Sequence, residues 1–149
     1  MPYEERNAWV ALIANVLIVS WFGWKVWTMS ADGAFDGPDG LALWARTVLW
    51  MIPVSIVATI ILSILFSIGA SIATRDTDPS FVSDERDKRF SARGMIATMV
   101  VVSAGLIGGL VLLAFGGSAF VALNLILFSF AFGAFVSEAL RLYFYRRGY

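Results

Sequence analysis

The chain of 149 residues contains no cysteine and no histidine. Without cysteine it can form no disulfide, no iron–sulfur cluster and no thiolate zinc site. Without histidine it lacks the imidazole used in general-base catalysis, in bis-histidine haem binding and most often in metal ligation. These absences exclude most redox enzymes and metalloenzymes, and we expect no cofactor.

Charge is also scarce. Only 15% of the residues are charged and 59% are hydrophobic, whereas about a quarter of a soluble domain is charged. No charged residue occurs in 7–24, 47–74 or 94–137. The first run approaches and the second exceeds the roughly 20 apolar residues that cross a bilayer, and the third is about twice that length. Its midpoint, residues 115–118, reads Phe-Gly-Gly-Ser and predicts a tight turn.

These runs predict an all-α integral membrane protein that forms a four-transmembrane-helix bundle, with residues 1–149 as a single membrane domain. The helices are expected at about 7–29, 41–73, 95–115 and 119–145, as two helical hairpins joined by a charged cytoplasmic segment, 74–93. The first span follows an acidic leader and is longer than the apolar core of a signal peptide, so we expect it to be retained.

The basic residues predict the orientation. All of them except Lys25 and Arg46 lie near the chain ends or in segment 74–93. The positive-inside rule therefore places both termini and this segment in the cytoplasm, with a bacterial inner membrane as the expected location. Tryptophans near Lys25, at positions 21, 24 and 27, are typical of an aromatic belt at the opposite interface.

Segment 74–93 contains the motif Asp84-Glu85-Arg86-Asp87. Its acids and bases nearly cancel and stand at i, i+4, which favours a short helix with internal ion pairs. Such a helix could be a solvated anchor for the following span, or a docking surface for a partner. For docking, the candidate interaction residues are Asp84, Glu85, Arg86, Asp87 and Arg93. A carboxylate pair performing acid–base chemistry would lack an accompanying nucleophile or metal ligand.

Polar residues within membrane spans often mark a transport path. The candidates here are Asn15, Asn124 and Glu138. At 1.5 Å per residue the two asparagines are expected at different depths. Glu138 is expected at the inner interface beside Arg141, as a surface ion pair rather than a proton site.

Small residues are spaced more regularly than the polar residues within the spans. Gly105 and Gly109 form a GxxxG pair, and Ser129 and Gly133 recur at i, i+4 in the last helix. Such stripes permit close approach of helices in lipid. We expect packing within the bundle, with self-association as the alternative use.

The loop at residues 31–40 contains three Asp-Gly pairs. Calcium prefers oxygen ligands, but the Asp-x-Asp-x-Asp-Gly spacing of calcium loops is missing. Asp-Gly is also ordinary turn chemistry, which is the reading we prefer.

Three short segments carry a family resemblance: YEERNAWV at 3–10, DERD at 84–87 followed by Arg93-Gly94, and YRRG at 145–148. The chain resembles a group of small prokaryotic four-span membrane proteins known as a domain of unknown function. Asn124 matches an asparagine often found in that group, whereas Phe90 stands where an aliphatic residue is usual. The resemblance implies the fold and topology and transfers no catalytic residue.

These features favour a non-enzymatic membrane protein: an accessory subunit or a small homo-oligomer, with residues 84–93 as its docking surface. The expected partners are the lipid bilayer and a second copy or a membrane complex, without nucleic acid. The alternative is a small oligomeric channel or transporter lined by Asn15 or by the serines at 63, 67 and 71, although the two halves do not form an inverted repeat. A membrane enzyme is the weakest reading.

Overall fold

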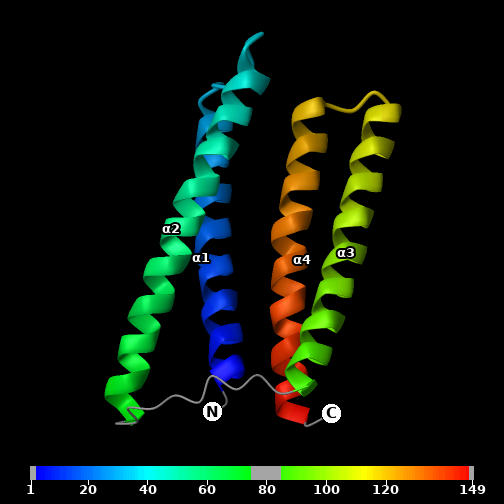
Figure 1. Ribbon diagram of the computed structural model, residues 1–149. Helices are drawn as coiled ribbons and strands as arrows, with labels where there is room; N and C mark the ends of the chain where they lie inside the picture. The colour runs from blue at the N-terminus through cyan, green and yellow to red at the C-terminus, as the bar shows by residue number, and fades with distance from the viewer. Residues whose placement is uncertain (1–2, 75–84, 148–149) are drawn as a thin grey trace. The chain divides into compact units, whose positions relative to one another are not determined.

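The computed structural model describes residues 3–74 and 85–147, apart from the side chains of 3, 4, 6, 70–74 and 86. Over these residues all regular structure is helical: α1 (Tyr3–Ala31), α2 (Gly40–Thr74), α3 (Glu85–Ala114) and α4 (Ala119–Arg147) (Figure 1). Each helix contains a stretch long and apolar enough to cross a membrane. The expectation of an all-α chain with four such helices is therefore confirmed.

The chain divides into two compact units, one made of residues 1–12 and 77–149 and the other of residues 13–76. The first unit contains the α3–α4 hairpin and the first turns of α1. The second contains the rest of α1 with α2. In each unit the two long helices are joined by a short loop (Figure 1).

A glycine cap ends α3 and sets the turn into α4. The Gly117 N–H donates to the Leu112 carbonyl at 2.9 Å, and Gly116 has φ +78°, in the left-handed region that favours glycine. Ser118 follows, and α4 begins directly after it. Gly33, with φ +72°, occupies the equivalent position after α1. Both reversals depend on a residue without a Cβ atom.

The α3–α4 hairpin is closely packed because small residues face each other across it. Cα atoms of α3 lie within 8 Å of Cα atoms of α4. A Cβ atom added at Gly105 would overlap the Cβ and Oγ atoms of Ser129, and one added at Gly109 would lie 2.9 Å from Ile126 Cγ1. All four residues that we expected in helix packing, including Gly133, contribute to this α3–α4 seam.

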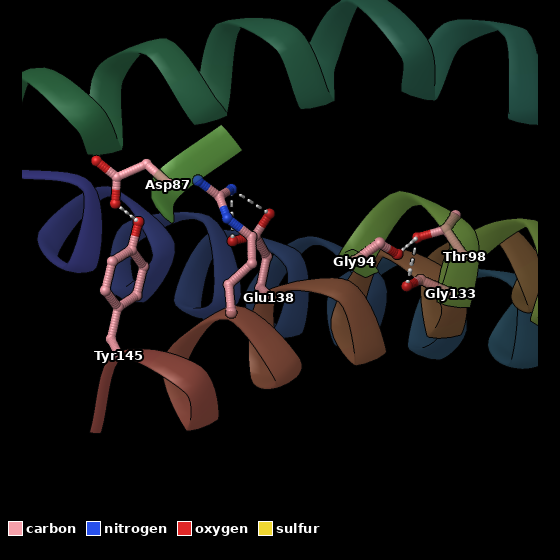
Figure 2. A network of polar contacts seen from close by, with 7 residues as sticks. Asp87, Gly94, Thr98, Gly133, Glu138 and Tyr145 are labelled. Atoms are coloured by element: carbon pink, nitrogen blue, oxygen red, sulfur yellow. Dashed lines mark hydrogen bonds and ion pairs between the residues drawn. The ribbon is translucent and has the colours of Figure 1, made fainter. Parts of the chain in front are cut away.

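The seam also contains a hydrogen bond between the helices. Thr98 Oγ1 donates to the Gly133 carbonyl at 3.0 Å and lies 3.2 Å from the Gly94 carbonyl of its own helix (Figure 2). A Cβ atom at Gly133 would come within 3.1 Å of Thr98 Cγ2. Glycine at this position therefore lets the threonine hydroxyl reach the opposite backbone, a contact worth about 0.6 to 2 kcal/mol in membrane helices.

The third helix starts earlier than the expected residue 95. α3 begins at Glu85, so the second half of the expected segment 74–93 is helical and continuous with the apolar stretch. Acidic residues occupy its first turn, where the helix dipole favours them. The helix continues through Gly94. This glycine packs against Ser137 of α4, whose Oγ would lie 2.5 Å from a Cβ atom added at Gly94.

Most large apolar side chains lie on the surface of the described structure. Only a few are buried, Phe22, Trp44 and Phe90 among them. In the most apolar 18-residue stretch of α2, no residue is buried. In water this distribution would leave an apolar surface far larger than monomeric soluble proteins expose.

Replacing Gly105 with alanine tests the seam. The added methyl group overlaps Ser129, so the helices must separate, and we expect the free energy of unfolding to fall by about 1 to 3 kcal/mol. The double variant Gly105→Ala/Ser129→Gly removes the serine side chain that the methyl group overlaps and should recover most of the loss. Unfolding with sodium dodecyl sulfate in mixed micelles, followed by circular dichroism, measures both.

Gly69→Ala is the matched control, because nothing lies within 4 Å of its added Cβ. Alanine is favoured over glycine in a helix by about 1 kcal/mol, so this variant should be unchanged or more stable. Equal stabilities for Gly105→Ala and Gly69→Ala would contradict the packing described here.

Candidate interaction site at the start of α3

The first turns of α3, residues 85–93, have an inner face that continues the α3–α4 seam. Asp87, Phe90 and Gly94 recur at the i, i+3, i+7 spacing of one helix face. Phe90 and Gly94 are buried and Asp87 is half-buried. This inner face therefore fixes residues 85–93 against the last turns of α4.

Two residues of α4 hold the inner face. The Tyr145 hydroxyl donates to Asp87 Oδ1 at 2.5 Å, and Figure 2 shows the tyrosine pointing from α4 toward the carboxylate. The ring of Phe90 stacks on Phe144 at 5.4 Å between centroids and meets Tyr145 edge-on at 5.3 Å. Each aromatic pair contributes about 0.5 to 1.5 kcal/mol beyond its burial, so the anchor combines packing with a charge-assisted hydrogen bond.

Arginines at this end of the unit lie over aromatic rings. They are Arg93 over Phe144 at 5.1 Å, Arg146 over Trp9 at 5.6 Å and Arg147 over Tyr143 at 5.0 Å. Contacts of this kind contribute about 0.5 to 1 kcal/mol at exposed sites. Since Trp9 belongs to α1, three helices of this unit contribute rings or cations to these contacts.

The opposite side of residues 85–93 is an outer face formed by Glu85, Lys88, Arg89 and Ala92, all exposed. The apolar part of α3 that follows Arg93 is about 31 Å long at 1.5 Å per residue. It alone matches a hydrocarbon core of about 30 Å. In a bilayer spanned by this part of α3, the outer face would extend about 13 Å beyond the core, on a helix that the inner face holds in place.

The other candidate interaction residues are placed as follows. Glu85 belongs to the outer face and Asp87 to the inner one, so the DERD motif is divided between two surfaces. Arg93 is exposed and lies over Phe144. Asp84 and the side chain of Arg86 lie outside the described residues.

The polar residues expected within the spans are not brought together at one site within a unit. Asn15 is half-buried in α1, in the second unit. Asn124 Nδ2 donates to the Phe120 carbonyl of its own helix at 2.8 Å. Glu138 and Arg141 form an ion pair at 3.1 Å, but their side chains are only 17% and 18% exposed. The two side chains are therefore more buried than those of the surface ion pair that we expected.

The loop between α1 and α2 shows no metal-binding arrangement. Its three aspartates are exposed. Across the described residues, which include this whole loop, no three acidic side chains converge. Gly33 and Gly40 take part in its turns through bonds such as Gly40 N–H to the Gly37 carbonyl at 2.9 Å. The Asp-Gly pairs thus coincide with turns.

The anchor was not predicted from the sequence. Phe90 and Tyr145 were considered for the family resemblance but not for the anchor, and Phe144 was not considered. The spacing of the seam residues could have predicted the α3 side of the anchor. When the small-residue stripe of α3 is extended toward the start of the helix, it includes Gly94, then Phe90 four residues earlier, and then Asp87. Their partners on α4 could not be read from local spacing, because Asp87 and Tyr145 are 58 residues apart.

A scan against protein-family models and searches of curated proteins and of solved structures each found no match to this chain. The case for a function therefore rests on the residues and contacts described above.

Replacing Tyr145 with phenylalanine tests the anchor. The ring contacts with Phe90 can persist, while Asp87 loses the hydroxyl donor. We expect the free energy of unfolding to fall by about 1 kcal/mol and amide hydrogen exchange to become faster at residues 85–93. Tyr143→Phe is the control, because Tyr143 is 46% exposed and its ring contacts survive the change. Unchanged exchange in Tyr145→Phe would show that the hydrogen bond does not hold the start of α3.

Proposed function

We propose that this chain is a multi-pass protein of a prokaryotic inner membrane, folded as a four-helix bundle with both termini and segment 74–93 on the cytoplasmic side. Two observations support the membrane location. Four helices are long and apolar enough to cross a bilayer, and most large apolar side chains are exposed. The positions of the basic residues support the orientation.

We further propose that the protein acts without catalysis, as an accessory subunit or a small homo-oligomer, and docks a partner through the outer face of α3. The observation that carries this proposal is the anchor formed by Asp87, Phe90 and Tyr145. It holds residues 85–93 to α4 from one side only, which leaves Glu85, Lys88 and Arg89 exposed on a supported helix.

A supported charged face is suited to recognition. Side chains on a preformed helix lose less conformational entropy on binding than side chains on a segment that must first become ordered. Glu85 carries one sign and Lys88 and Arg89 the other, so the face favours a partner with a complementary arrangement of charges. In this proposal the exposed charges of the outer face, which can also pair with one another at i, i+4, are the groups that meet the partner.

Reversing charge on the outer face tests the docking surface. In the double variant Lys88→Glu/Arg89→Glu, like charges would oppose each other at the interface, and we expect at least a tenfold loss of the bound partner or second copy. The protein is purified from native membranes in mild detergent. Quantitative mass spectrometry then measures the partner, and light scattering measures the mass of the complex.

The matched control is Asp32→Lys/Asp36→Lys, which reverses the same number of exposed charges in the loop between α1 and α2. This variant should retain the partner. A monomer without any partner in the unaltered protein, or equal retention in both double variants, would contradict the proposed role of the outer face.

A further inference from the structure

The second unit contains an apolar cleft between α1 and α2. It has a volume of about 190 Å³, and its walls include Leu17 and Trp21 of α1 and Met51, Val54, Ala58 and Leu62 of α2. Ser55 also lines it, but its hydroxyl donates to the Ile52 carbonyl of its own helix at 2.8 Å. The hydrogen-bonding need of that hydroxyl is thus met within α2, and the cleft suits an apolar occupant.

The cleft exists because α1 and α2 approach each other less closely than α3 and α4 do. Close Cα pairs, within 8 Å, run along the α3–α4 seam and are scarce between α1 and α2. Large side chains such as Leu17, Trp21 and Met51 line the cleft, whereas the other hairpin has glycine and serine at its seam. A neighbouring apolar group must fill the remaining space to recover the dispersion contacts that a void forfeits.

The length of the cleft matches one leaflet of a bilayer. About 17 Å of helix separates Met51 from Leu62, and half of a hydrocarbon core is about 15 Å. Trp21 lies at one end, followed along α1 by Trp24 and Trp27, which are 62% and 73% exposed. Exposed tryptophans are typical of the headgroup level, so this end of the cleft is the end at the interface.

One cation stands at that end. Lys25 follows Trp21 by one helical turn, on the same face of α1, and its Nζ lies 5.4 Å from the centre of the Trp21 ring. Lys25 is exposed. Arg46, the other basic residue near this end, points about 140° away from the cleft by the rotation of α2. Lys25 is therefore the cation positioned to meet a ligand in the cleft.

We propose that this cleft binds one acyl chain of an anionic phospholipid, with the lipid phosphate beside Lys25. The volume exceeds the roughly 150 Å³ of an apolar cavity that holds a benzene molecule, so the cleft takes a segment of the chain and leaves the rest outside it. In a bilayer an apolar cleft alone distinguishes poorly between lipids, because every lipid offers similar chains. The preference for one headgroup must then come from Lys25. This inference assumes the membrane location proposed above and is independent of the outer face of α3.

The full chain, delipidated in mild detergent, is titrated with dioleoyl phosphatidylglycerol or dioleoyl phosphatidylcholine, and native mass spectrometry counts the bound lipids. We expect the anionic lipid to bind about fivefold more tightly, as one basic residue at a lipid surface provides. Lys25→Gln should abolish the difference, whereas Arg46→Gln should preserve it. Both side chains are exposed, so neither change should disturb folding.

A second pair of variants tests the cleft itself. Ala58→Phe fills it, whereas Ile60→Phe places the same ring at nearly the same depth on the opposite side of α2, where Ile60 is 53% exposed. Only Ala58→Phe should lose the bound phosphatidylglycerol, with the helix content of both variants unchanged by circular dichroism. Equal binding of the two lipids to the unaltered protein, or equal retention by the two phenylalanine variants, would overturn the proposal while leaving the membrane location intact.

Discussion

The close approach of α3 and α4 is the constraint on which the first unit depends. In the proposed membrane location there is little hydrophobic driving force between helices, because lipid tails are as apolar as leucine, so association would rely on dispersion contacts and interhelical hydrogen bonds. Both require the backbones to be close. Glycines at 94, 105, 109 and 133 remove the side chains that would keep them apart, and the Thr98 hydroxyl then reaches the opposite carbonyl.

The same seam determines where charge is presented. Because Asp87, Phe90 and Gly94 extend it beyond the apolar stretch, α3 stays helical and attached to α4 through its charged first turns. The α1–α2 hairpin is packed differently. Its facing side chains are large, the helices stand further apart, and a cleft remains between them. One hairpin is thus closed by its own small residues, and the other is open to an apolar ligand.

Much of this architecture could be predicted from the sequence. Uncharged runs indicated the four helices, and the spacing of Gly105, Gly109, Ser129 and Gly133 indicated the seam. The short helix predicted within 74–93 and the span expected from residue 95 form one continuous helix, α3. Their separation was drawn where charge ends, although helix formation depends on periodicity and capping rather than on charge. The hydrogen bond between Asp87 and Tyr145 and the partial burial of Glu138 arise from tertiary packing, which local spacing cannot reveal.

Disulfide cross-linking in native membranes tests the seam most directly, since the chain has no cysteine of its own. An added Cβ at Gly94 would lie 3.5 Å from Ser137 Cα. The two Cα atoms are then no more than about 5 Å apart, which is close enough for a disulfide. Gly94→Cys/Ser137→Cys should therefore cross-link rapidly within one chain under mild oxidation. The pair Arg89→Cys/Ser137→Cys, with one cysteine on the outer face, should not. Equal rates for the two pairs would contradict a continuous α3 packed along α4.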